Sequence, residues 1–231
     1  MSRYATTDLH GCLHTFRRLV EHELRLTTAD ELYLLGDYVN KGPDSRGVLD
    51  YLMHLQRAGF RVHCLRGNHD QALLDAARPR WFRGWPAASL QPTLRSFGVK
   101  RAADIPAPYL DWLAALPYDL ELPDFLLVHA GYDFALPPAQ LRLDYDTMLN
   151  TRSFVFDPSR TGGRRVLHGH VPTPAARVRA QAVFQPGVLG LDTGCVYRHN
   201  AGYAHLTALN LDTWALTQVP NCEPAYPIGR R

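Results

Sequence analysis

The stretch ELYLLGDYVNKGPDS (residues 31–45) changes character half-way along its length. Its first half is an apolar run that is typical of a buried strand, and Gly36-Asp37 interrupts that run. The second half carries an amide, a lysine, a glycine and a proline from Asn40 to Pro43. A buried strand that ends on a carboxylate and then enters a short polar loop is typical of the ligand-binding edge of a parallel sheet.

Strands and helices are expected to alternate on both sides of this stretch. Apolar residues recur at helical spacing between short apolar runs, which favours an α/β sheet with covered faces and right-handed crossovers. The expected elements are strands at residues 3–7, 31–35 and 61–65, and helices at 12–26, at 44–58 and after Gly67.

The rest of the chain has a different pattern. Residues 78–116 are rich in Pro, Trp and Arg and are predicted to form a helical cap insertion. A strand is predicted at Phe125 to Val128, paired with residues 118–122. Shorter strands are expected at 164–167, 187–191, 204–211 and 214–219, with a turn at Asp212-Thr213. We therefore expect one domain over residues 1–231 that contains the insertion.

Composition narrows the class of protein. A net charge of +3 over 231 residues is too small to indicate dedicated nucleic-acid binding. The four cysteines are dispersed with no CxxC pair, which predicts no thiolate zinc site and suits a reducing compartment. No apolar run is long enough for a membrane span, and the N-terminal residues lack the apolar core of a signal peptide. We expect a cytoplasmic protein that does not bind membranes.

Polar side chains follow five of the predicted strands, at the point where each strand ends. Any one of them alone is better explained as a helix cap, a turn residue or a satisfied polar group. Five such ends together predict a site at the edge of the sheet, if these strands lie side by side. The residues are Asp8 and His10, Asp37, Asn68 and His69, His129, and His168 or His170.

The side chains at these ends indicate a metal site. Carboxylate, imidazole and amide ligands without thiolate suit Mn, Fe or Zn. The candidate ligands exceed what a single catalytic ion would use, so two ions are expected, roughly 3.5–4 Å apart and bridged by a carboxylate. Such a centre holds a hydroxide for in-line attack on phosphorus, and Arg66 would clamp the phosphate.

Five blocks in the same order resemble the phosphoprotein phosphatase family of calcineurin-like metallophosphoesterases. That family includes bacterial serine/threonine phosphatases and symmetrical diadenosine tetraphosphate hydrolases. The resemblance covers residues 4–197 and implies a β-sandwich core in αββα layers. The blocks are DLHG (8–11), GDYVNKG (36–42), RGNHD (66–70), LLVHAG (126–131) and HGH (168–170), and LDTGC (191–195) resembles the bacterial members especially.

The resemblance also implies a role for each matching residue. Asp37 would bridge two ions, most simply Mn, with Fe or Zn as alternatives. His69 would protonate the leaving oxygen, and Arg66 and Arg152 would contact phosphate. The implied ligands are Asp8, His10 and Asp37 for one ion, and Asp37, Asn68, His129 and His170 for the other, with His170 matching the family ligand rather than His168.

Four positions depart from the family pattern. Thr7 replaces a glycine, which we expect to be tolerated, and Asn150 replaces a tryptophan near Arg152. Lys41 replaces an arginine and keeps the charge without the bidentate fork. Asn40 replaces an aspartate, so it is expected to accept a hydrogen bond from His69 without raising the pKa of that histidine as far.

These observations leave several functions open. Our first interpretation is hydrolysis of phosphate monoesters, with a phosphorylated protein or a small phosphorylated molecule as substrate. The alternative in the same fold is symmetrical hydrolysis of diadenosine tetraphosphate or another nucleoside polyphosphate. An alternative of another class is a non-catalytic binding module. Residues 8–14 also allow a small local metal site that would use Cys12 and His14.

Overall fold

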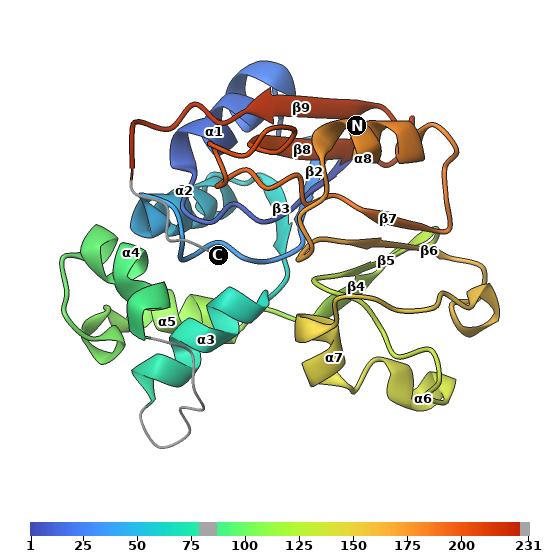
Figure 1. The fold of residues 1–231 in the computed structure, drawn as a ribbon, viewed down its shortest axis with the longest axis horizontal. Coiled ribbons are helices and arrows are strands. Elements are labelled where there is room, and N and C mark those ends of the chain that lie inside the picture. Colours follow the sequence, from blue (N-terminus) through green and yellow to red (C-terminus); the bar gives the residue numbers. More distant parts are fainter. Residues whose placement is uncertain (79–86, 227–231) are drawn as a thin grey trace.

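A computed structural model describes residues 1–78 and 87–226, which form two facing β-sheets with helices outside them (Figure 1). The first sheet has the order β3 (Arg61–Cys64), β2 (Glu31–Leu34), β1 (Arg3–Thr6), β8 (His205–Asn210) and β9 (Leu216–Pro220). The second has the order β4 (Asp119–Glu121), β5 (Phe125–Val128), β6 (Arg165–His168) and β7 (Val188–Gly190).

Each sheet contains three parallel strands. In the first, β1, β2 and β3 run parallel, and β8 and β9 are antiparallel additions. In the second, β5, β6 and β7 run parallel and β4 pairs antiparallel with β5. The predicted strands are thus confirmed to within a few residues, including the pairing of residues 118–122 with β5. The turn after β8 is also confirmed, because the Trp214 amide donates to the Asn210 carbonyl at 2.8 Å.

The apolar run at 31–35 is continuous because both faces of β2 are buried. Successive side chains of a strand point to opposite faces. Leu32 and Leu34 pack into the helix-covered face of the first sheet, whereas Tyr33 and Leu35 pack between the two sheets. Because both of their faces are buried, parallel strands of this kind have uninterrupted apolar runs in the amino-acid sequence.

Helices cover the outer face of each sheet and give the αββα layers that the resemblance implied. The first sheet is covered by α1 (Leu13–Arg18), a π-helical turn (Leu19–Glu23), α2 (Ser45–Arg57), α3 (Asn68–Ala77), α4 (Ala87–Phe97), a 3₁₀ turn (Ala102–Asp104) and α5 (Ala107–Ala114). The second is covered by α6 (Pro138–Leu141) and α7 (Tyr145–Asn150), followed by a 3₁₀ turn at Pro158–Arg160. Helix α8 (Ala175–Ala182) packs into the core between the sheets.

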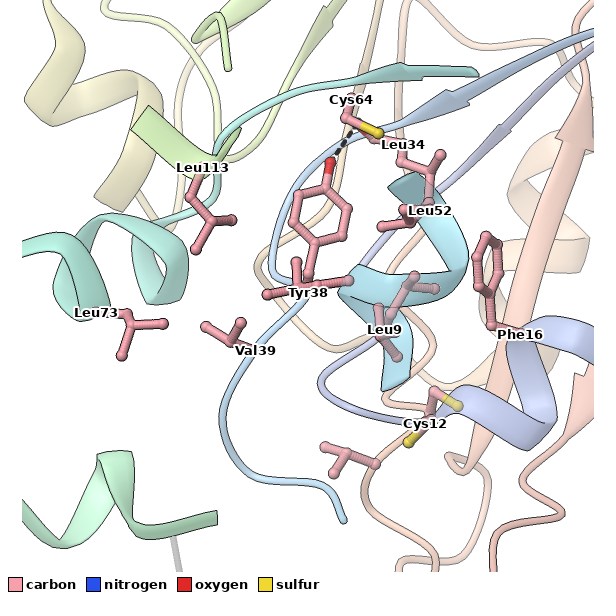
Figure 2. Close-up of a cluster of buried hydrophobic side chains, with 14 of the residues drawn as sticks. Leu9, Cys12, Phe16, Leu34, Tyr38, Val39, Leu52, Cys64, Leu73 and Leu113 are labelled. Atoms are coloured by element: carbon pink, nitrogen blue, oxygen red, sulfur yellow. Dashed lines mark hydrogen bonds between the residues drawn. The ribbon is translucent and has the colours of Figure 1, made fainter. Parts of the chain in front are cut away.

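The largest core cluster joins these helices to the first sheet (Figure 2). Leu52 of α2 and Leu113 of α5 lie on either side of Tyr38 in the loop after β2, and Phe16 of α1 lies beyond Leu52. The Tyr38 hydroxyl donates to the Leu65 carbonyl at 2.7 Å, so this loop is tied to the end of β3. The backbone that follows Asp37 is therefore fixed by the core itself.

The structure differs from the helix predicted at 12–26 and describes only part of the insertion predicted at 78–116. The single helix predicted at 12–26 is wrong in its second half, where the Leu24 amide donates to the Leu19 carbonyl at 2.9 Å and widens the helix to a π-helical turn. The insertion predicted at 78–116 contains α4 and α5, and its residues 79–86 lie outside the described part. The assignment of a single domain stays a prediction. Within the described residues, no helix is long and apolar enough to cross a membrane.

Candidate metal centre

The predicted ligands come from the carboxyl ends of parallel strands in both sheets. We expected one edge of a sheet if the five strands lay side by side, but the strands are divided between the two layers. The parallel strands of both layers end on the same side, so their loops meet. Asp8 and His10 follow β1, Asp37 follows β2, Asn68 opens α3 after β3, His129 follows β5, and His170 follows β6.

Asp37 lies at the middle of this group. Its two carboxylate oxygens face histidines from different sheets: Oδ2 lies 3.4 Å from His10 Nε2, and Oδ1 lies 3.5 Å from His129 Nε2. His10 Nε2 also lies 3.7 Å from Asp8 Oδ1. One carboxylate thus faces both halves of the ligand set, which is the position that a bridging ligand requires.

Hydrogen bonds to the backbone orient the histidine rings. Nδ1 of His10 lies 2.9 Å from the Val39 carbonyl, and Nδ1 of His129 lies 2.8 Å from the Leu35 carbonyl. A carbonyl only accepts, so each Nδ1 carries the proton and each Nε2 presents a lone pair to the centre. His129 Nε2 lies 3.1 Å from Asn68 Oδ1, so two acceptor atoms face each other. A cation bound by both atoms would remove their mutual repulsion.

The charges of the buried groups fit a divalent cation as well. Burial, with a contribution from Lys41, lowers the pKa of His10 to about 3, and burial lowers that of His170 to about 4, so both rings are neutral near pH 7. Burial and the nearby Asp8 charge raise the pKa of Asp37 well above its usual range. His170 Nε2 is buried without a hydrogen-bond partner. A divalent ion would bind the neutral imidazoles, offset the repulsion between the carboxylates, and give the His170 nitrogen a partner.

The loops that carry the predicted site residues share one kind of backbone strain, a left-handed φ angle. Left-handed φ angles are uncommon for residues other than glycine, and they cluster at functional sites because the surrounding structure must enforce them. Six predicted site residues have such angles: Asp8 (55°), His10 (44°), Asp37 (61°), Asn40 (67°), Lys41 (65°) and His170 (67°).

Two glycines allow the loops to approach one another. A Cβ on Gly67 would lie 2.2 Å from Asp37 Oδ1, and one on Gly169 would lie 2.2 Å from Asp8 Oδ2. Both distances are far below van der Waals contact, so any side chain would displace a predicted ligand. The glycines of the RGNHD and HGH blocks are therefore explained by crowding around the carboxylates.

A comparison with protein families shows the family to which the chain belongs. The model of the calcineurin-like phosphoesterases matches residues 1–214, which include every predicted ligand. The chain belongs to the calcineurin-like phosphoesterase family. The fold class, the enzyme class and the resemblance expected from the sequence are confirmed at this level.

Curated relatives match a little more than half of the chain. A symmetrical bis(5'-nucleosyl)-tetraphosphatase of Shewanella sp. (strain MR-7) is 36% identical over 146 residues, which are 62% of this chain and 47% of the relative. The enzyme of the same name from Nitrosomonas europaea is 37% identical over 131 residues, which are 57% of this chain and 45% of the relative. The chain thus spans about half the length of the curated relatives it matches.

Solved structures extend the likeness over the whole fold. A crystal structure described as a "putative diadenosine tetraphosphatase" is 26% identical with a TM-score of 0.67, over 96% of this chain and 94% of that one. A serine/threonine phosphatase from Saccharomyces cerevisiae has a TM-score of 0.64 at 13% identity, over 97% of this chain and 81% of that one. The second likeness concerns the calcineurin-like fold alone.

Of the predicted phosphate contacts, two lie in the pocket over the ligands. A pocket of about 400 Å³ is lined by Lys41 and Arg152 together with Asp37, Asn68, His69, His170, Pro172 and Tyr197. Arg66 lies elsewhere: its guanidinium donates to the Gln71 side chain and the Tyr118 hydroxyl, both at 2.9 Å, and to the Leu116 carbonyl at 3.1 Å. Its contact with phosphate stays a prediction.

Asn40 is hydrogen-bonded to His69, but in the opposite sense to our expectation. The Thr93 hydroxyl donates to Asn40 Oδ1 at 2.7 Å, and the amide nitrogen Nδ2 faces His69 Nδ1 at 3.2 Å and the His69 carbonyl at 3.4 Å. Asn40 therefore donates to the ring instead of accepting from it. Burial, followed by the charge of Lys41, lowers the pKa of His69 well below its usual range.

Two supporting residues lacked a predicted role. The Asp70 carboxylate accepts from the backbone amides of Gly67, Asp37 and Tyr38 at 2.9–3.0 Å, which joins the loops after β2 and β3. An acidic residue at the third position of a helix is a known capping signal that could have revealed it. Thr7, expected only to be tolerated, donates from its hydroxyl to Asp8 Oδ2 at 2.6 Å.

The local metal site at residues 8–14 is wrong. Cys12 is completely buried in the helix-covered core, whereas His14 is exposed on α1. The two side chains therefore have opposite environments, and Cys12 belongs to the packing of the first sheet.

Proposed function

We propose that this chain is a two-metal phosphoesterase that cleaves a phosphoanhydride bond of a nucleoside polyphosphate. The observation that carries the proposal is the convergence of six oxygen and nitrogen ligands from two sheets beneath a pocket lined by Lys41 and Arg152. Asp8, His10 and Asp37 would hold one ion, and Asp37, Asn68, His129 and His170 would hold the other. Bound divalent ions, with Mn as our first choice, would supply Lewis-acid catalysis and an activated water.

The chain's own residues position the substrate. Lys41 and Arg152 provide the positive charge that a phosphate group requires, and both are side chains of the pocket over the ligands. His10 and His129 are held in one tautomer by backbone carbonyls, so the ligand geometry is set before substrate enters. Water would add to one phosphorus while its bond to the bridging oxygen of the anhydride breaks. One product would carry the oxygen of the water, and the other, a nucleoside phosphate, would leave with the bridging oxygen.

The contact between Asn40 and His69 favours an anhydride over an alkyl ester. With Nδ1 of His69 accepting from the Asn40 amide, the ring carries its proton on Nε2 and is neutral. A neutral imidazole is a weak acid, whereas a phosphate leaving group departs without needing a proton. The names of the curated relatives, symmetrical bis(5'-nucleosyl)-tetraphosphatases, support the same choice.

A phosphomonoesterase is the second candidate, and the position of His69 supports it. His69 lines the pocket, and its Nε2 lies 4.0 Å from Asp37 Oδ2, within reach of a phosphate ester bound over the ligands. Activated aryl phosphates, whose leaving group is stable as an anion, would suit this arrangement. A phosphorylated protein substrate belongs to this second candidate.

A substrate panel separates the two candidates. The Mn-loaded protein is assayed with diadenosine tetraphosphate, p-nitrophenyl phosphate and a phosphoserine peptide, and the nucleotide products are separated by chromatography. We expect kcat/KM for the tetraphosphate to exceed that for the peptide by about 10²-fold or more, since general acid catalysis is worth roughly that much. Symmetrical cleavage would give ADP alone. Faster hydrolysis of the peptide would overturn the proposal, and activity that survives chelation would exclude the metal mechanism.

A further inference from the structure

A second pocket adjoins the one over the ligands. It has a volume of about 380 Å³ and lies between α3 and α7, lined by Gln71, Asp75, Tyr118, Tyr145, Asp146 and Asn150. Asn68, a predicted metal ligand, lines both pockets, and Arg152 of the first pocket is two residues from Asn150 of the second. A substrate whose phosphates lie over the ligands can therefore extend directly into this second pocket, which we call the tyrosine pocket.

Two stacked rings give the tyrosine pocket a flat aromatic surface. The rings of Tyr118 and Tyr145 lie 4.3 Å apart between centroids with an angle of 19°, and Tyr145 is 47% exposed. The Arg66 guanidinium lies 4.7 Å from the Tyr118 centroid and donates to the Tyr118 hydroxyl at 2.9 Å. A buried arginine thus fixes the inner ring, and the outer ring is accessible to a ligand.

The polar groups of the tyrosine pocket leave mainly acceptors for a ligand. The Asn150 amide nitrogen donates to the Asp146 carboxylate at 3.0 Å, and the Gln71 amide nitrogen donates to the Asp75 carboxylate at 2.8 Å. Each NH₂ group therefore makes at least one hydrogen bond within the protein, and the Gln71 carbonyl oxygen already accepts from Arg66. The carboxylates of Asp75 and Asp146 can accept further hydrogen bonds and repel phosphate, in contrast to Lys41 and Arg152 in the first pocket.

We propose that the tyrosine pocket binds the nucleobase of the substrate, and that it favours a base with an exocyclic amino group. A flat ring would stack on Tyr145, and its amino group would donate to the carboxylates of Asp75 and Asp146. The phosphate chain would remain in the first pocket because these carboxylates exclude it. This inference rests on the proposed function, since it assigns the other end of the same substrate.

The larger pocket near Phe134 and Phe154 is a weaker candidate for the base. Its volume is about 600 Å³, but none of its lining residues also lines the pocket over the ligands. Thr151 and Ser153 of that pocket flank Arg152, but no residue lines both that pocket and the one over the ligands. The tyrosine pocket shares Asn68, a predicted metal ligand, with the pocket over the ligands.

The test compares substrates with and without a base. Tyr145→Ala, Tyr145→Phe and wild type are assayed with diadenosine tetraphosphate and with inorganic tripolyphosphate. We expect Tyr145→Ala to raise KM for the dinucleotide about 10- to 100-fold, as loss of one base–aromatic stack does. The ratio of kcat/KM for the dinucleotide to that for tripolyphosphate should fall by a similar factor. Tyr145→Phe retains the stacking ring and should remain within about twofold of wild type.

The base itself supplies a second comparison. Diinosine tetraphosphate has a carbonyl where adenine has an amino group, so acceptors of the protein would face an acceptor of the base. We expect its KM to exceed that of the adenosine compound about 5-fold or more, and Asp146→Asn to reduce this difference. Phe184→Ala is the matched control, because Phe184 is a highly exposed aromatic residue that lines neither pocket.

Binding of AMP to the metal-free protein, measured by calorimetry, separates failure of this inference from failure of the proposed function. Tyr145→Ala should weaken that binding about 10-fold or more whether or not the protein cleaves anhydrides. If wild type cleaves diadenosine tetraphosphate and Tyr145→Ala changes neither KM nor AMP binding, the tyrosine pocket is not the base site. If Tyr145→Ala instead impairs only a basic phosphopeptide, the pocket binds a cationic side chain and the inference is wrong.

Discussion

The ligand cluster and the walls of the two pockets are built in different ways. Around the ligands, Asp8, Asp37 and His129 are at most 2% exposed, and each is held by backbone contacts. In the pocket walls, Arg152 and Tyr145 are exposed and have ordinary backbone angles, and only Lys41 of the cations there has a left-handed φ angle. The difference indicates that reaction chemistry is set by the backbone, whereas substrate choice is left to side chains that can change without altering the fold.

The most severe test of this comparison removes charge at the centre of the cluster. Asp37→Asn should lower kcat/KM at least about 10³-fold, about 4 kcal/mol in the barrier, because a neutral amide cannot bridge two cations. Its Oδ1 can still accept from the His69 amide, so the circular dichroism spectrum should be unchanged. Metal content and activity are measured beside Asp111→Asn, an exposed aspartate on α5. A folded Asp37→Asn protein with near-normal activity would refute the bridging role.

The next test adds a methyl group beside the predicted ligands and leaves every ligand residue unsubstituted. Gly169→Ala places a methyl group against Asp8 and Thr7, and we expect activity to fall about 10²-fold, as misplacement by about 1 Å can cause. Metal affinity, measured by titration, should weaken in parallel because Asp8 is displaced. Normal affinity with reduced activity would mean that crowding at residue 169 acts on the substrate instead.

A third test concerns Asn40 and His69, which lie between the ligand cluster and the pocket walls. Burial and Lys41 lower the pKa of His69, and a carboxylate in Asn40→Asp would raise it. If protonated His69 is the acid, activity on an alkyl phosphate falls as pH rises through that pKa, so the fall should lie below pH 6.5 in wild type. In the variant it should move upward by about one unit. The pH profile for the anhydride should change little, and identical profiles for both proteins would show that residue 40 does not control the acid.

The smallest expected effect is in the pocket wall. Lys41→Met removes one cation over the ligands, and we expect KM for diadenosine tetraphosphate to rise about 3- to 10-fold with little change in metal content. In the present structure Lys41 Nζ lies 2.8 Å from His10 Nε2, so loss of this contact leaves the ring nitrogen more available. A large loss of bound metal would instead place Lys41 with the cluster.

Local sequence motifs predicted the ligand cluster better than they predicted the residues that surround it. The run at β2, the helices of the first half and the ligand-bearing loops are each specified within a few residues of sequence. The contact of Thr93 with Asn40 joins positions 53 apart, and Arg66 reaches Leu116, 50 residues away. No local pattern encodes such contacts, because they depend on how α4 and α5 pack. For the same reason the sequence did not show that two sheets, not one, supply the ligands.

The division of the ligands between the sheets couples metal binding to folding. Asp8, His10, Asp37 and Asn68 belong to the first layer, whereas His129 and His170 belong to the second. Ions held by both layers would act as a cross-link that opens only when the sandwich opens. At a free metal concentration 100 times the dissociation constant, such a link adds about 2.7 kcal/mol to the free energy of unfolding. The melting temperature of the protein would then follow the metal supply of its surroundings.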